Sequence, residues 1–589
     1  MPEPRWPAAR MRWTREQVIR VVWLVSALAL GMQSHGGPDF RRYNEWLKAF
    51  ASYDILRIKS TVLSPVGVPV TQWSYAPALM SDAIGRALSL LPVEIGVLTV
   101  PWLAALAFWW ALIGLVRLVT RGDPLLLALT VGAAFVGTQA GYYSIHHSSE
   151  IFALACFAVA AFWALSAGPE RLRDSLIIGV ACGLLLIVRV NLIMYVPLPL
   201  AARALIVWRG HGGRLNRAVV FHAVALGLPL LAYAAQLSLF NYWMTGSASQ
   251  SPYVYGGGDF RSVDLAHPLL GTTLFHSWHG LLSYHPLFAL GPLALAALAL
   301  RRELPISERL LSGYALLAMF AQFYMQASWW CWWLGTGTFG CRTLALAGVL
   351  VVVALARWLF LLKKSATRKD LTYALMLLGF TAAACFWSLL LFLQGDSNYL
   401  TWRELLEAQR QFLFEPSVFV PVVGATVMSL GFGVVAFRKL RSRAVLVAIT
   451  AFIATLAAQS LLARPLEVWH FTPARAGLVN AIAFGAIVYL ATDSQAQPRP
   501  VRLARTLVAS ALLWVFVVGN WTFTQLALAT KSVIAGSTAD PRHYRYRSTM
   551  VIEELLSCVA EYDRVEGFTK RKLTARRFVE AAAEEARRK

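Results

Sequence analysis

The polar segment at residues 33–92 holds the carboxylates of this sequence that are best placed for chemistry. Asp39, Glu45 and Asp54 follow the first long apolar run, and a Gly-Gly-Pro motif at 36–38 precedes the first of them. That motif breaks a helix and presents Asp39 close to a membrane surface. A carboxylate there can act as general base towards a hydroxyl or hold a divalent cation. The alternative is that it caps the next helix, with Glu45 on the helix surface.

A second polar group stands in the short stretch YYSIHHSSEIF at 142–152. His146, His147 and Glu150 are unusually dense for a connection between two apolar runs, and imidazole with carboxylate is a common metal-ligand set. With Asp39, His147 and Glu150 are candidates for a divalent ion such as Mg or Mn. The alternative is an interfacial turn with Glu150 in the first turn of a helix. Two imidazoles are unnecessary for capping, which favours a site.

Two arginines could stabilise an anion. Arg189 is flanked by apolar residues near the external end of an expected span, where a cation is costly unless it meets an anion. A lipid phosphate or one of the loop carboxylates would satisfy it, and snorkelling to the interface is the alternative. Arg342 ends the sequence SWWCWWLGTGTFGCR at 328–342, and arginine is the usual partner of phosphate.

Aromatic and flexible loops could bind a sugar. Four tryptophans precede Arg342, and their faces are the usual platform for sugar rings, although an aromatic belt is the alternative reading. The loop at 242–283 carries a Gly triplet at 256–258 and is expected to gate the substrate. The candidate substrate-binding residues are Glu45, Glu150, Tyr255, Asp259, His279, Trp329, Trp330, Trp332 and Trp333.

The elements that must position these residues are membrane helices. The chain has 589 residues, of which 58% are hydrophobic and 14% charged, and its mean hydropathy is +0.56. This apolar content excludes a soluble globular protein. The formal net charge of +23 lies in short connections between apolar runs, which indicates the positive-inside pattern and excludes nucleic-acid binding.

Apolar runs of bilayer length predict an all-α polytopic protein with roughly thirteen to fifteen spans. The expected spans are 18–34, 93–118, 124–143, 150–167, 174–190, 192–208, 217–241, 284–300, 309–328, 343–362, 371–394, 417–437, 444–463, 475–492 and 505–528. Every second connection is rich in Lys and Arg, which places the N-terminus in the cytoplasm. The short pair at 174–208 could instead be a re-entrant hairpin.

The predicted organisation is a transmembrane domain at 1–528 and a polar tail at 529–589 with short surface helices. Polar external loops at 33–92, 242–283 and 329–342 would form the active site. Six cysteines do not make a disulfide framework. Cys331 and Cys341 fall in one external loop and could form a bridge in an oxidising compartment.

The order of these motifs resembles that of bacterial integral membrane glycosyltransferases of the C type (GT-C). The resemblance covers roughly residues 15–350 and rests on the acidic first loop, the His/Ser turn, Arg-x-Asn at 189–191, the NYWxTG and HGLLSYHP stretches and the WWxWWxGxxxFGxR loop. It implies an inverting transfer on the outer face of the bacterial inner membrane, from a polyprenyl-phosphate sugar to a glycan, lipid or protein acceptor. Asp39 matches the position of the base, and Arg189, Arg342, His146 and His147 would stabilise the leaving phosphate.

This sequence differs from the family pattern at two places, and other functions remain as alternatives. Relatives often carry paired acids at the position of Asp39, and their later loop commonly reads Gly-Pro-Arg where this chain has Gly340, Cys341 and Arg342. A transporter or flippase of lipid-linked intermediates would also need many spans, but it predicts two matching halves and charges buried at mid-membrane. The sequence shows neither. A glycan polymerase or an acyltransferase is a further alternative.

Overall fold

The computed structural model describes residues 75–77, 79–80, 93–145, 149–250, 265–275, 280–328, 340–365, 371, 374–379, 381, 384–385 and 388. The regular structure in these ranges is helical, which confirms the predicted all-α class. Residues 1–74 with Asp39 and the expected span at 18–34, the expected spans from 417 onwards, and the tail at 529–589 lie outside the described residues.

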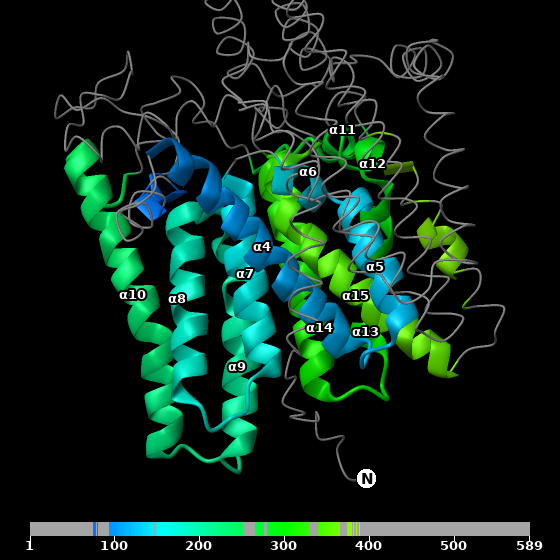
Figure 1. Cartoon of the computed structure of the whole chain (residues 1–589), viewed down its shortest axis with the longest axis horizontal. Coiled ribbons are helices and arrows are strands. Elements are labelled where there is room, and N and C mark those ends of the chain that lie inside the picture. The colour runs from blue at the N-terminus through cyan, green and yellow to red at the C-terminus, as the bar shows by residue number, and fades with distance from the viewer. Residues whose placement is uncertain are drawn as a thin grey trace, which may run out of the picture.

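The helices follow one another closely along the chain (Figure 1). The first group comprises α4 (Val93–Val119), α5 (Pro124–Gly137), α6 (Gln139–Ile145), α7 (Ser149–Ser166), α8 (Leu172–Val188), the 3-10 helix η2 (Val190–Tyr195), α9 (Pro197–Gly210) and α10 (Arg217–Thr245). The second comprises α11 (Leu270–Phe275), α12 (Leu281–Tyr284), η4 (Pro286–Ala289), α13 (Leu290–Leu300), α14 (Ile306–Ala327), η5 (Arg342–Leu344) and α15 (Ala345–Ser365).

Four stretches in the described part of the chain are long and apolar enough to cross a bilayer. They are Ser149–Ser166, Val190–Gly210, Arg217–Thr245 and Arg342–Ser365. Each coincides with an expected span, because an apolar run of this length satisfies its backbone hydrogen bonds within one helix. The chain is therefore a polytopic membrane protein.

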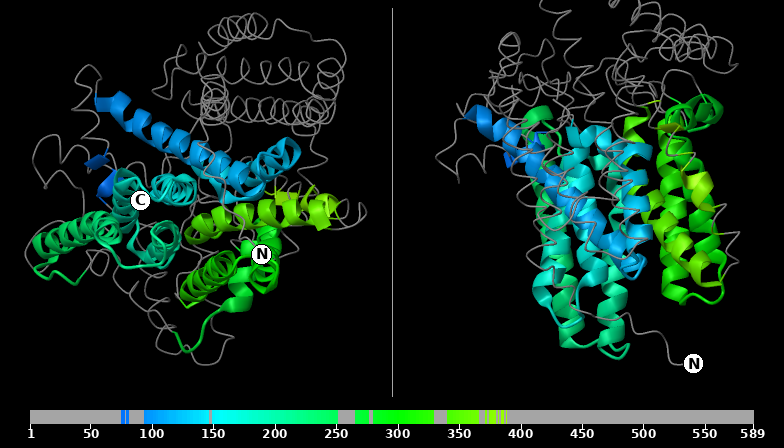
Figure 2. Two further views of the ribbon diagram at one scale, coloured as in Figure 1. Left: turned by 90° about the horizontal axis from the view of Figure 1, so that it is seen from below. Right: turned by 45° about the vertical axis from the view of Figure 1, so that its right-hand side comes forward.

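The core of the described bundle lies around α7 and α15. Helix α7 packs against α4, α8 and α9, and α15 packs against α4, α5 and α13. Figure 2 shows α4 running obliquely across this core. Of the most apolar 18-residue stretch of each helix, 72% of the residues are buried in α7 but only 6% in α10, which packs chiefly on α8. Most of α10 is therefore left to face lipid.

One expected span is not a single helix. The run at 124–143 divides into α5 and α6 at Thr138, whose backbone is extended (φ −127°, ψ 169°). The Thr138 hydroxyl donates to the carbonyl of Ala134 at 2.6 Å and accepts from the amide of Ala140 at 3.1 Å. It thus caps both helices, and the prediction of one continuous helix was wrong because threonine can replace the backbone partners lost at a helix end.

Two further spans begin irregularly. The run at 284–300 starts within α12 and passes through η4, where Pro286 interrupts the helix, before α13 begins at Leu290. The pair at 174–208 forms two helices, α8 and α9, joined by η2. Following the predicted topology, we call the end that bears Arg189 and the start of α7 the external end, and the other the cytoplasmic end.

Matched ion pairs join helices at the cytoplasmic end. Arg357 of α15 donates from Nε and Nη2 to the two carboxylate oxygens of Glu308 in α14, at 2.6 and 3.0 Å. Lys363 of α15 pairs with Asp123, which also caps α5 by accepting from the amides of Leu125 and Leu126. These pairs fix α14 and α5 to α15.

Candidate functional site

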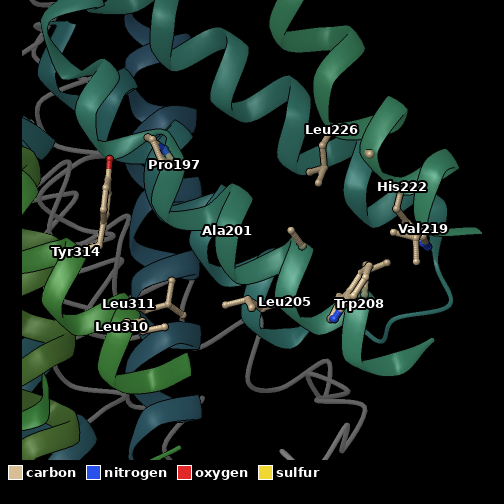
Figure 3. A pocket seen from close by; sticks show the side chains of 13 residues that line it. Pro197, Ala201, Leu205, Trp208, Val219, His222, Leu226, Leu310, Leu311 and Tyr314 are labelled. Carbon is tan, nitrogen blue, oxygen red and sulfur yellow. The ribbon is translucent and has the colours of Figure 1, made fainter. Parts of the chain in front are cut away.

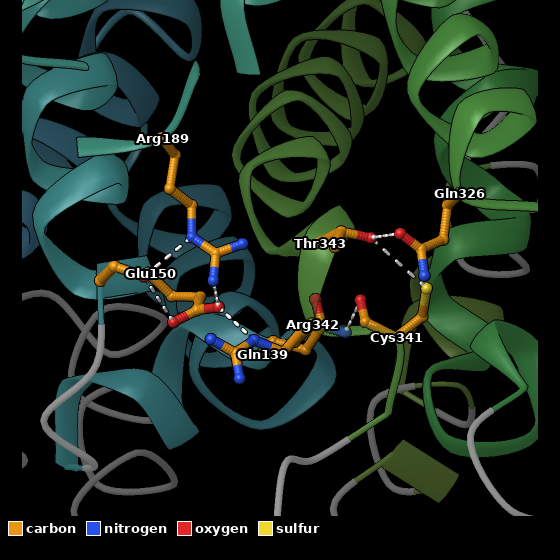
Figure 4. Close-up of polar contacts among 8 residues, drawn as sticks. Gln139, Glu150, Arg189, Gln326, Cys341, Arg342 and Thr343 are labelled. Atoms are coloured by element: carbon orange, nitrogen blue, oxygen red, sulfur yellow. Dashed lines mark hydrogen bonds and ion pairs between the residues drawn. The ribbon is translucent and has the colours of Figure 1, made fainter. Parts of the chain in front are cut away.

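Three residues singled out in the sequence meet at the external end (Figure 4). Glu150 lies in the first turn of α7, Arg189 lies between α8 and η2, and Arg342 begins η5. Arg342 Nε donates to Glu150 Oε1 at 2.7 Å, and Arg189 Nη2 donates to the same oxygen. One carboxylate thus joins two guanidinium groups that are 39 and 192 residues away in the sequence.

Neighbouring groups fix this cluster. Arg189 Nε donates to the Ser149 hydroxyl at 2.9 Å, and that hydroxyl lies 3.4 Å from Glu150 Oε2. The Glu150 side chain is only 2% exposed, whereas Arg189 and Arg342 are 13% and 16% exposed. The carboxylate is therefore the buried anchor, and the two guanidinium groups form the partly accessible side of the cluster.

Helix geometry explains why these residues tolerate burial. A carboxylate in the first turn of a helix is favoured by the partial positive charge at the N-terminus, and Glu150 occupies that place in α7. Arg189 follows the last residue of α8 and its amide donates to the carbonyl of Leu185 at 3.0 Å. A cation is favoured at that C-terminal end. Both helix termini thus stabilise the charge that they carry.

A second set of polar contacts positions Arg342. Gln139, at the start of α6, donates from Nε2 to the backbone carbonyl of Cys341 at 2.6 Å. Thr343 donates to the side-chain oxygen of Gln326 in α14 at 2.7 Å. Both glutamines are buried and were missed in the sequence. A signal existed, because a polar residue inside an apolar run such as 124–143 is costly unless it has a specific partner.

Gly340 lies against His285. Its backbone is left-handed (φ +62°), and a Cβ added there would lie 2.7 Å from His285 Nε2. Both the conformation and the space therefore require glycine, since an L side chain is strained at this φ and would also clash. His285 is fully buried, so it has little room to move. This contact sets the path of the chain into Arg342.

Cys341 is a free, buried thiol. Burial raises the pKa of this thiol to about 12, so it is protonated at neutral pH and a poor nucleophile. The bridge to Cys331 stays a prediction, because Cys331 lies outside the described residues.

Most of the other candidates lie outside the described residues. These are Asp39, Glu45, His146, His147, Tyr255, Asp259, His279, Trp329, Trp330, Trp332 and Trp333. Within the described ranges no three His, Cys, Asp or Glu side chains gather as a metal-ligand set. Glu150 Oε1 accepts from two guanidinium groups. A divalent ion held by Asp39, His147 and Glu150 stays a prediction.

Comparison with known proteins finds structural likeness only. No protein-family model matches the sequence, and no curated protein matches it significantly. The chain is similar to ArnT from Cupriavidus metallidurans bound to undecaprenyl phosphate, with 15% identity, 85% of this chain and 77% of that chain covered, and a TM-score of 0.35. It is also similar to the apo oligosaccharyltransferase of Archaeoglobus fulgidus, with 12% identity, 65% of this chain and 59% of that chain covered, and a TM-score of 0.38. Likeness at this level leaves the activity to be argued from the chain's own residues.

Proposed function

We propose that this protein is a membrane glycosyltransferase that takes a sugar from a polyprenyl-phosphate donor at the outer face of the bacterial inner membrane. The observation that carries the proposal is the convergence of Arg189 and Arg342 on Glu150 at the external end. Two guanidinium groups at one point suit a phosphate, which accepts several hydrogen bonds at once. The acceptor would be a glycan, a lipid or a protein.

The location suits a donor that cannot leave the bilayer. The arginine pair lies where α7, α8 and α15 begin or end, so a phosphate bound there would stand at the membrane surface with its chain in the lipid. Holding donor and acceptor in one geometry removes much of the entropic part of the barrier. The arginines would stabilise the charge that develops on the leaving phosphate.

In the proposed reaction Asp39 is the general base. Its carboxylate takes the proton of an acceptor hydroxyl while that oxygen attacks the anomeric carbon of the sugar. The bond from that carbon to the phosphate oxygen breaks on the opposite face, and the electron pair leaves with the lipid phosphate. The configuration of the anomeric carbon is therefore inverted. No step is assigned to a metal.

Asp39→Asn tests the base. The asparagine keeps the size of the side chain but cannot accept a proton at neutral pH, so we expect loss of glycan transfer while expression and membrane insertion persist. Transfer is measured with the full chain in vesicles containing a polyprenyl-phosphate sugar, and Asp54→Asn in the same loop is the matched control. Normal transfer by Asp39→Asn would exclude this residue as the base.

The acceptor is best identified in cells. Deletion of the chain should remove one sugar from one glycan, lipid or protein, and expression of the unchanged chain should restore it. Accumulation of a complete lipid-linked glycan on the cytoplasmic side would instead indicate a flippase, the main alternative.

A further inference from the structure

A cavity of about 810 Å³ lies between α9, α10 and α14, away from the arginine cluster (Figure 3). Its walls are almost wholly apolar. The lining residues are Pro197, Ala201, Ala204, Leu205, Val207, Trp208, Val219, His222, Ala223, Leu226, Leu310, Leu311 and Tyr314.

The shape of the cavity comes from one face of α9. Pro197, Ala201, Ala204 and Trp208 recur at helical spacing, so they share that face. The two alanines are exposed and small, which leaves a groove between the larger side chains of α10 and α14. Figure 3 shows Trp208 and Tyr314 towards opposite ends of this groove.

The chemistry of the walls selects a hydrocarbon occupant. Two of the three lining side chains that carry a polar atom use it within the protein: Tyr314 donates to the carbonyl of Met194 at 2.9 Å, and His222 Nδ1 lies 2.7 Å from the Ser175 hydroxyl. The third is the indole N–H of Trp208. A polar ligand would find few partners here. The groove opens towards lipid, since Trp208 and Leu310 are 41% and 62% exposed.

The length of the groove matches one leaflet. From Pro197 to Trp208 the helix rises by about 16 Å at 1.5 Å per residue, and half of a bilayer core is about 15 Å. Trp208 stands in the last turn of α9, at the cytoplasmic end, where tryptophan favours the interface. The groove therefore spans the depth of the cytoplasmic leaflet.

The charge beside its cytoplasmic end is positive. Residues 203–223 contain four arginines and no carboxylate. Arg209 and Arg217 are exposed and lie one and two residues from the lining positions 208 and 219. Arg203 is buried and donates to Ser175 and to backbone carbonyls, so its role is structural. On the neighbouring helices, Asp174 and Glu308 contact Arg173 and Arg357.

We propose that this groove binds an acyl chain of an anionic phospholipid of the cytoplasmic leaflet, with the headgroup phosphate beside Arg209 and Arg217. The apolar walls receive the chain, and the arginines distinguish an anionic headgroup from a zwitterionic one. Each basic residue near an anionic lipid contributes about fivefold in binding.

Photolabelling tests the proposal. The full chain is placed in nanodiscs that contain phosphatidylglycerol, or phosphatidylcholine, with a diazirine in the middle of one acyl chain, and labelled peptides are mapped. We expect preferential labelling of α9, α10 and α14 by phosphatidylglycerol. Arg209→Gln and Arg217→Gln should each lower it roughly fivefold, whereas Arg302→Gln, at another exposed site on the cytoplasmic end, should not.

A second pair of variants tests the groove itself. Ala204→Trp fills it and should abolish the labelling, whereas Leu231→Trp, at a 68% exposed position of α10 outside the lining, should leave it unchanged. Equal labelling by the two lipids, or labelling that survives Ala204→Trp, would overturn the proposal. The proposal would also be overturned if undecaprenyl phosphate, but not excess phosphatidylglycerol, displaced the labelled lipid. Crosslinking of a second copy of the chain at this face would overturn it as well.

Discussion

Two glutamates, the buried Glu150 and the half-buried Glu308, pair with arginine in opposite ways. At the cytoplasmic end Glu308 uses both oxygens for one partner, Arg357, in a fork of two parallel bonds. At the external end Glu150 offers one oxygen, Oε1, to two partners, Arg189 and Arg342. A fork holds two helices together with fixed geometry. A shared oxygen brings two guanidinium groups to one point, and neither forms two parallel bonds with the carboxylate. A phosphate can accept hydrogen bonds from two guanidinium groups held in this way.

Of the variants that test this difference between the two ends, Arg342→Ala should have the largest effect. If the shared pair binds the donor phosphate, we expect kcat/KM for the donor to fall by about 100-fold, because truncating one partner of a buried charge pair costs about 2–5 kcal/mol. Initial rates against donor concentration in vesicles measure this. Arg302→Ala is the control, and an unchanged donor dependence would make Arg342 a structural residue.

Glu308→Gln should affect stability and leave the chemistry intact. Loss of the forked pair leaves Arg357 without that carboxylate partner, and we expect the free energy of unfolding to fall by about 3 kcal/mol. Unfolding in detergent micelles gives the stability, and transfer per folded molecule gives the activity. A loss of transfer with unchanged stability would show that the two ends do not differ in role.

Gly340→Ala should lower both stability and transfer, each by less than the two variants above. The left-handed backbone and the close contact with His285 predict a cost of about 1–3 kcal/mol, together with a shift of Arg342 that lowers transfer. The matched control is Gly132→Ala in α5, where an added Cβ meets no atom within 4 Å and a helical alanine is favourable. The free energy of unfolding and the KM for the donor are measured for both variants. Equal values for the two would contradict the conclusion that Gly340 sets the position of Arg342.

Lys363→Met should have the smallest effect. The lysine is 43% exposed, and an exposed ion pair contributes about 0–1 kcal/mol. Asp123→Ala removes two capping bonds from α5 as well as the ion pair, so it should cost about 1 kcal/mol more. Unfolding of the two variants in micelles separates the cap from the pair. Equal losses would show that the pair matters more than its exposure suggests.

Much of the fold could be predicted from the sequence, because apolar runs of bilayer length determine helices locally. The bounds of the expected spans at 150–167 and 217–241 lie within one residue of those of α7 and within four of those of α10. The division at Thr138 could not be seen, because a capping threonine does not lower the apolar content of the run. Pro286 was visible, yet the effect of a proline on a helix depends on its neighbours.

The candidate site could be predicted in its parts but not in its geometry. Arg189, Arg342 and Glu150 stood out as charges beside apolar runs, and a loop carboxylate was one expected partner of Arg189. That a single oxygen serves both arginines depends on how α7, η2 and η5 pack, which local patterns do not encode. Gln139 was missed because its partner is a backbone carbonyl 202 residues away.

The backbone at Cys341 bears on how this loop can vary. Its φ of −76° is close to the value that a proline ring imposes, and Gln139 binds its carbonyl, which a proline also has. The contacts of the described residues include no hydrogen bond from its amide. A Gly-Pro-Arg loop and this Gly-Cys-Arg loop can therefore follow the same path. Proline in place of Cys341 would make the unfolded chain stiffer and remove a buried thiol, and the arginine would stay in place.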